Sequence, residues 1–238
     1  MSLHGGISRN CDYMIPEWIT NAAREYNNHS FQNRDSYAAV LLMPIKNLVT
    51  ILDWTFQSLP DEILVGMDPD PEILNPTKVE KKYLGDEHNI DMFAGQGYLL
   101  GEPHLVNRGN SYEVHHVPEE WVDGIFAKER GSRGGRFTHW LHTHPNAPAI
   151  PSEADADASQ WTEGTDMILG VRFTPEGHLP WFENVDGVRR QLTEHDDLTT
   201  LGRARTGHLI HSLEIICFHR SGLGINLVLT DDMGNPIE

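Results

Sequence analysis

Two histidines and a downstream aspartate are the residues of this chain whose types and spacing point most directly to chemistry. They are His142, His144 and Asp155, and Asp155 follows Ser152 by three positions. The residues leading up to Leu141 are typical of a strand. Alternate side chains of a strand share one face, so both imidazoles can reach the same ion. Two histidines and one carboxylate, with a fourth position left open, are the pattern of a catalytic zinc site.

The segment between the histidines and the aspartate predicts how the carboxylate is positioned. Prolines at positions 145, 148 and 151 predict a rigid, irregular loop. Ser152 is a natural helix N-cap, and residues 153–158 suit a first helical turn. Asp155 lies one turn in from this cap, so its side chain can project back toward the histidines.

The complete stretch resembles the signature of the JAMM (MPN-plus) metalloprotease family, which is His-x-His-Pro, six residues, and then Ser-x-x-Asp. Here it reads His142-Thr143-His144-Pro145, residues 146–151, and Ser152-Glu153-Ala154-Asp155, without a gap or substitution. The resemblance implies that zinc is held by His142, His144 and Asp155, and that Ser152 has a polarising role. The alternative is a chance His-x-His on a surface strand beside an ordinary capping serine. The offsets of the serine and the aspartate favour the metal site.

The start of the chain's core region resembles the start of the same family's fold. An apolar stretch over residues 37–43 predicts a buried strand, and apolar residues at helical spacing predict a helix from Ile45 to Leu59. Leu-Pro-x-Glu then opens a second strand over residues 61–66. In the JAMM family the glutamate after this helix is the general base, which corresponds to Glu62 here.

This part of the chain departs from the family pattern, which is Glu-x-x-Gly-x-x-x-Gly. After Glu62 the first glycine comes one residue late, at Gly66, and the second is missing. A second alignment matches the later glycines at 97 and 101 and places Ala94 at the glutamate position. The base would then be absent or supplied by a neighbour such as Glu102 or Glu113.

The alternation of strands with a few helices predicts an α/β fold, a single domain with a curved mixed β-sheet flanked by helices. The resemblance implies the JAMM/MPN, cytidine-deaminase-like architecture. We expect an N-terminal extension over residues 1–36, and one domain over 37–238 that includes a C-terminal extension from about 185. The remaining expectations are a long loop at 67–91, strands at 97–105 and 111–117, helices at 118–129 and 154–161, a strand at 167–173 with a partner at 178–184, a short strand at 188–192, and a last strand pair at 208–219 and 223–230.

Composition bounds the class of protein and its partners. The chain has 238 residues, 39% of them hydrophobic, and a net charge of -17 from 35 acidic and 18 basic residues. Such an acidic chain is expected to repel nucleic acid and anionic membrane. No apolar run reaches the ~18 residues of a membrane span, and Cys11 and Cys217 are too far apart in sequence to suggest a disulfide framework. These features predict a cytoplasmic protein.

The resemblance implies a zinc-dependent hydrolase that cleaves a peptide or isopeptide bond at the C-terminal tail of a ubiquitin-like or sulfur-carrier protein. A basic loop with Arg130, Arg133 and Arg136 precedes the metal motif and is a candidate contact for such a substrate. Two alternatives stay open. One is a catalytically inactive MPN-type scaffold or binding module, and the other is a hydrolase of small-molecule amides that uses the same site.

Overall fold

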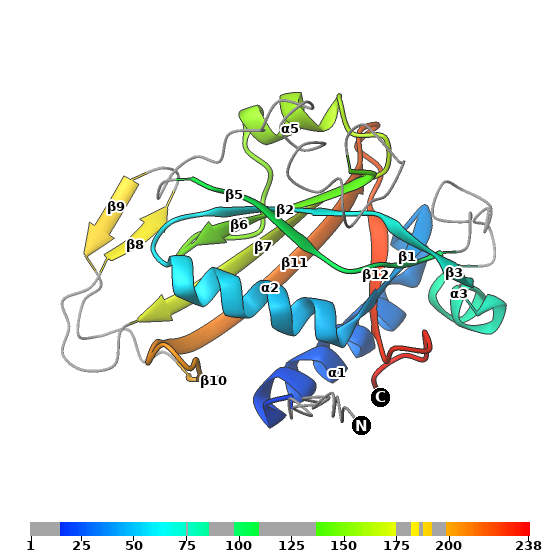
Figure 1. Ribbon diagram of the computed structural model, residues 1–238, viewed down its shortest axis with the longest axis horizontal. Coiled ribbons are helices and arrows are strands. Elements are labelled where there is room, and N and C mark those ends of the chain that lie inside the picture. Colours follow the sequence, from blue (N-terminus) through cyan, green and yellow to red (C-terminus); the bar gives the residue numbers. More distant parts are fainter. Residues whose placement is uncertain are drawn as a thin grey trace, which may run out of the picture.

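A six-stranded mixed sheet runs through the centre of the computed structural model of this protein (Figure 1). The structure describes residues 15–74, 76–85, 98–109, 137–174, 182–185, 188–191 and 199–238. In these ranges the helices are α1 (Glu17–Gln32), α2 (Ile45–Ser58), α3 (Thr77–Tyr83) and α5 (Glu153–Ser159), with a 3-10 turn η1 at Arg34–Ser36. None of the helices described is long and apolar enough to cross a membrane.

The central sheet has the strand order β10-β11-β7-β6-β2-β5. Its strands are β2 (Ile63–Met67), β5 (His104–Arg108), β6 (His139–Pro145), β7 (Thr165–Thr174), β10 (Gly202–Arg203) and β11 (Leu209–His219). β6 and β7 pair in parallel, and the other neighbours pair antiparallel. Smaller pairs join β1 (Ala39–Pro44) to β12 (Ile225–Thr230), β3 (Pro69–Leu74) to β4 (Tyr98–Leu100), and β8 (Phe182–Val185) to β9 (Val188–Gln191). The predicted α/β class with a mixed sheet is confirmed.

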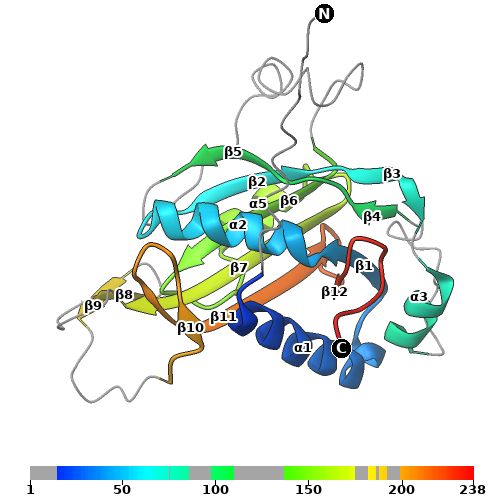
Figure 2. The ribbon, with the colours of Figure 1, turned by 60° about the horizontal axis from the view of Figure 1, so that its bottom comes forward.

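Helix α2 covers the face of the central sheet opposite to the face that carries His142 and His144. It begins directly after Pro44, and its apolar stripe packs into the main core. The buried apolar residues of the helix are Ile45, Leu48, Ile51, Leu52 and Phe56. Leu141 of β6 belongs to the same core, so it faces α2. Because strand side chains alternate, His142 and His144 point to the opposite face of the sheet. Figure 2 shows α2 lying across the sheet.

Helix α1 lies within residues 1–36 and is fastened to the C-terminal strand β12. Ile19 and Ala23 of α1 are buried in the main core. The Asn27 side chain donates to the carbonyl oxygens of Leu229 (2.7 Å) and Ile237 (2.9 Å) and accepts from the Leu229 amide (2.8 Å). These three bonds satisfy backbone groups that would otherwise be buried beside the helix without partners.

Two predictions for residues 67–105 are wrong. The predicted long loop at 67–91 contains β3 and α3, which are hard to predict from sequence because both are short and β3 contains two prolines. The single strand predicted at 97–105 is two strands, β4 and β5, in different sheets. The chain turns between them at Gly101, whose amide donates to the Asp68 carbonyl at 2.9 Å and whose carbonyl accepts from Asn47 at 2.7 Å.

Two predicted pairings of later strands are also wrong. β11 and β12 do not form a hairpin ladder; β11 pairs with β7, and β12 pairs in parallel with β1. An isolated bridge, Phe218 to Gly224, and a hydrogen bond from the His219 amide to the Leu223 carbonyl join the end of β11 to the turn before β12. In the described part of the partner strand predicted for β7, residues 182–184 belong to β8, which pairs with β9. The sequence of an apolar strand does not identify the strand with which it pairs. Its partner depends on packing on both faces of the sheet.

Several sequence predictions lie outside the described residues. They are the strand at 111–117, the helix at 118–129, the basic loop with Arg130, Arg133 and Arg136, the alternative base Glu113, and residues 1–14 of the N-terminal extension.

Candidate metal centre

The central strand β6 presents both histidines of the motif on the same face. His142 and His144 are two residues apart, and their Nε2 atoms lie 3.0 Å from each other. Their side chains keep 14% and 13% of their accessible surface, so the ring nitrogens are sheltered but reachable from solvent. β7 pairs with β6 at both histidines, and β2 pairs with it at His142, so the backbone is held on both sides at His142 and on the β7 side at His144.

The loop after β6 fixes the orientation of His144. Asn146 has a positive φ of 52°, and its side chain accepts a 2.8 Å hydrogen bond from the Phe173 amide. The loop then returns so that the Pro148 carbonyl lies 3.0 Å from Nδ1 of His144. A carbonyl can only accept, so Nδ1 carries the hydrogen and Nε2 of the neutral ring keeps its lone pair. This is the arrangement in which a histidine binds a metal through Nε2.

Gly170 of β7 makes room for that loop. It pairs with His144 across the sheet, and a Cβ at this position would stand 2.8 Å from the Ala149 nitrogen and 2.9 Å from the Ala147 oxygen. Both neighbours are backbone atoms, which cannot move aside as a flexible side chain can. The absent side chain therefore allows the loop to lie directly on β7, where the Pro148 carbonyl meets His144.

A capping box at the start of α5 positions the third member of the group. Ser152 is the N-cap, and its Oγ accepts a 3.2 Å hydrogen bond from the Asp155 amide. In return, Oδ2 of Asp155 accepts from the Ser152 amide at 2.7 Å. The two reciprocal bonds hold the aspartate in the first turn with its carboxylate directed at the histidines.

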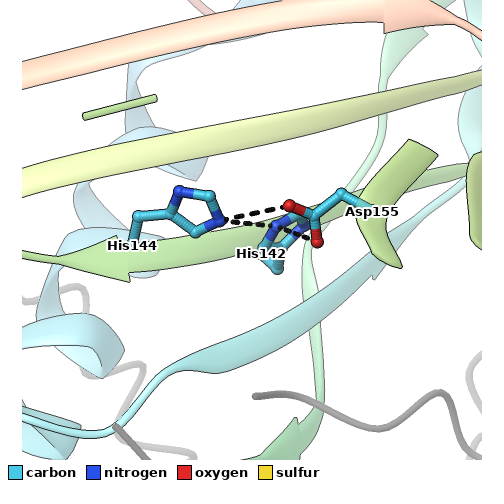
Figure 3. A group of neighbouring side chains, drawn as sticks. All are labelled: His142, His144 and Asp155. Carbon is cyan, nitrogen blue, oxygen red and sulfur yellow. Dashed lines mark hydrogen bonds and ion pairs between the residues drawn. The ribbon is translucent and has the colours of Figure 1, made fainter. Parts of the chain in front are cut away.

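The three side chains converge on a common point (Figure 3). Oδ1 of Asp155 lies 3.1 Å from Nε2 of His142, and Oδ2 lies 3.5 Å from Nε2 of His144. Ligand atoms ~2.0–2.1 Å from a tetrahedral zinc ion stand ~3.3 Å from one another. The observed separations are therefore those of a ligand set that a zinc ion could join after small side-chain rotations. The three are the group of metal-ligating residues found among those the structure describes.

The electrostatics of the group keep the carboxylate ionised. Burial alone raises the pKa of Asp155, but hydrogen bonds from His142 and His144 outweigh it and hold that pKa well below its usual range. Burial lowers the pKa of His144, but hydrogen bonds to Asp155 and to the Pro148 carbonyl raise it to a value above the ordinary one. A negative carboxylate between two imidazoles attracts a cation, and a metal ion would take the place of the shared protons.

Glu62, predicted as the general base, lies beside this group. The antiparallel register of β2 and β6 pairs Leu64 with His142, and Glu62 precedes β2 by one residue at the same end of this pair. The Glu62 side chain is close enough for its charge to raise the pKa of His144. The residue is only 7% exposed. Glu102, the alternative base, is exposed and lies near the other end of β2, since His104 pairs with Gly66.

The sequence interpretation did not identify Asp166, a buried acid on the same face of the sheet. It pairs with Trp140 of β6, is 6% exposed, and has one carboxylate oxygen without a hydrogen-bond partner among the described residues. Burial raises the pKa of Asp166 to about 7, a hydrogen bond with Thr162 opposes the rise, and the charge of Asp155 adds to it. The signal in the sequence is a lone acid in the apolar strand β7.

A cavity of about 490 Å³ lies between α5 and the outer edge of β11. Its lining includes Ala156 and Ser159 of α5 together with Ile216 and Phe218 of β11. None of the three clustered residues lines it, so the cavity and the candidate metal centre are separate features.

Comparison with known proteins gives a structural likeness at low sequence identity. No family model matches the chain, and no curated protein matches its sequence. The fold is similar to the solution structure of protein DSY2949 from Desulfitobacterium hafniense, at 12% identity and a TM-score of 0.36, with 82% of this chain and 95% of that chain covered. A likeness at this level carries no argument about function.

Proposed function

We propose that this protein is a zinc-dependent hydrolase of the JAMM type, with the JAMM/MPN architecture, that cleaves a peptide or isopeptide bond. The observation that carries the proposal is the convergence of His142, His144 and Asp155, with the buried Glu62 close enough for its charge to act on His144. Three ligands and a nearby carboxylate are what metal-assisted amide hydrolysis requires.

Each residue has a distinct role in the proposed reaction. His142, His144 and Asp155 hold the ion, and the Pro148 carbonyl and the Ser152 amide orient two of these ligands. When bound, zinc supplies a water molecule whose pKa is lowered to ~7.

With the ion in place, Glu62 would serve as the general base and carry a proton to the departing amine, which can leave only once it is protonated. The Ser152 hydroxyl accepts from the Asp155 amide, so its own hydrogen is available for donation to the developing oxyanion.

The proposed substrate is the C-terminal tail of a ubiquitin-like or sulfur-carrier protein, which rests on the resemblance of the motif. An extended tail ending in Gly-Gly can pair with a sheet edge and place its scissile carbonyl at the site, because small residues fit a narrow channel. The cytoplasmic location remains a prediction, and so does the absence of nucleic-acid and membrane partners.

Metal analysis tests the ligand assignment. The purified protein is expected to bind about one zinc per chain, because the three ligands form one site. His142→Ala and Asp155→Ala should each lose the metal. Full zinc occupancy in His142→Ala would refute the assignment. Asp157→Ala, an exposed acid of the same helix, serves as the control and should keep the metal.

Hydrolysis is tested with Glu62→Gln, which should retain zinc and the fold but lose activity, since an amide cannot accept the proton. The substrates are linear and isopeptide fusions of ubiquitin-like proteins, each with its Gly-Gly intact or replaced by bulky residues. Wild-type activity in Glu62→Gln would show that another residue is the general base. Equal rates across the panel would leave only a general metallohydrolase. No cleavage with zinc bound would favour the scaffold or the small-amide hydrolase.

A further inference from the structure

The peptide group that joins Glu62 to Ile63 is held at both ends. Its carbonyl oxygen, on Glu62, accepts a hydrogen bond from the Gly109 amide at 3.0 Å. Its N–H, on Ile63, donates to Oγ1 of Thr143, also at 3.0 Å. One bond reaches toward β5 and the other toward β6. The plane of this peptide group is therefore fixed between the two strands that flank β2.

The bond to Thr143 stands where the backbone ladder stops. The backbone pairing of β2 with β6 ends at Leu64 and His142, one residue short of the Ile63–Thr143 position. At that position the Ile63 amide takes the threonine hydroxyl as its acceptor. Thr143 and Ile63 are both fully buried, so water cannot replace the hydroxyl if it is removed.

Thr143 also lies between the two candidate metal ligands in sequence. Its side chain points away from the metal face, while His142 and His144 point toward it. The same residue thus joins the strand that carries the histidines to the peptide group that carries Glu62. Rotation of that peptide group would change ψ of Glu62 and swing its carboxylate relative to His144.

We infer that Thr143 is a positioning residue that aims the Glu62 carboxylate at the metal-bound water through the Ile63 amide. The inference rests on the proposed function, because it assigns Glu62 as the base. The inference predicts that zinc affinity does not depend on the Thr143 hydroxyl, since the hydroxyl touches none of the three ligands in the contacts described.

The test compares Thr143→Val, which keeps the shape and removes the hydroxyl, with Thr143→Ser, which keeps the hydroxyl. In Thr143→Val we expect kcat to fall by about 10–100-fold, a part of the ~10²–10⁴ that a positioned base contributes. KM and the zinc Kd should stay within about 2-fold, because substrate and metal contacts are unchanged. Thr143→Ser should restore kcat to within about 3-fold.

Two controls separate positioning from general damage. Thr55→Val removes another fully buried hydroxyl, one that bonds to Ile51 within α2, and should leave kcat unchanged. Thr143→Val combined with Glu62→Gln should be no slower than Glu62→Gln alone, because a positioning residue has no effect once its target is gone. A further tenfold loss in the double variant, or loss of zinc along with kcat, would overturn the inference.

A crystal structure of zinc-loaded Thr143→Val provides a readout that does not depend on activity. The Glu62 carboxylate should be displaced while the three ligands stay in place, and an unmoved Glu62 would overturn the inference. If Thr143→Val fails to fold, Thr143→Ala takes its place in every measurement. If the wild-type protein binds zinc but cleaves nothing, the proposed function fails, and this structural comparison still decides the role of Thr143.

Discussion

Replacement of Asp166 by asparagine should make the protein more stable at neutral and alkaline pH. The carboxyl is 6% exposed and has an unpartnered oxygen, so the folded state holds it more easily protonated than charged. Its pKa rises from 3.8 to about 7 on folding, chiefly through burial. Between these values the folded state binds more protons than the unfolded state. The free energy of unfolding therefore falls as pH rises through this window.

The size of the effect follows from the two pKa values. A change of one in pKa corresponds to ~1.4 kcal/mol, so the separation between 3.8 and about 7 corresponds to ~4 kcal/mol. This contribution to stability is fully present below pH ~4 and lost above pH ~7. Asparagine does not titrate, so Asp166→Asn should gain up to ~4 kcal/mol over the wild type between pH 4 and pH 8.

Urea unfolding of metal-free protein across this pH range measures the effect. The relevant quantity is how the difference between variant and wild type changes with pH. The titration of the histidines of the metal centre is common to both proteins, and a change in the bond to Thr162 adds a constant offset to the difference. Asp157→Asn, at an exposed position of α5, is the control and should show a flat difference. A flat difference in Asp166→Asn as well would refute the argument that burial keeps this carboxyl protonated.

Three further substitutions test the structure around the site and the core. Ser152→Ala should cost about 1 kcal/mol in urea unfolding, because the N-cap acceptor for the Asp155 amide is lost, whereas Ser152→Thr should retain both stability and hydrolysis. Gly170→Ala should weaken zinc binding by about 10–100-fold in a metal titration, because its Cβ displaces the loop that orients His144; Gly224→Ala, which meets only a ring at 3.5 Å, should not. Asn27→Leu should cost about 2–4 kcal/mol in thermal or urea unfolding, because its two buried hydrogen bonds with Leu229 and its partly buried bond to Ile237 are lost; an unchanged midpoint would contradict this.

The sequence predicted the parts of the site that depend on local order. His142 and His144 come together through the alternation of one strand, and Asp155 joins them through one turn of helix after a serine cap. Glu62 was singled out by the resemblance that the preceding helix and Leu-Pro carry; its charge acts on His144, and its role as the base stays a prediction.

The parts that the sequence did not predict depend on partners that are distant in the chain or are backbone atoms. Every residue has a backbone carbonyl, so the sequence does not single out that of Pro148 as the partner of His144. The role of Gly170 becomes visible only when β7 lies beside β6. The predicted pairing of β11 with β12 was wrong for the same reason. Alternation of apolar residues indicates which face of a strand is buried, but not which strands lie at its two edges. Segments β3 and α3 were missed because they are too short to show a period.

The parallel pairing of β1 with β12 has a consequence for how the chain folds during synthesis. Asn27 and Leu229, which lock α1 onto β12, are 202 residues apart. At ~5–20 residues per second on the ribosome, β12 is synthesised ~10–40 s after α1 and the apolar strand β1. Through that interval the edge of β1 is open to pairing with other nascent chains. Expression with a trigger-factor or Hsp70 type chaperone should therefore raise the soluble yield more than a stabilising substitution within α2 does.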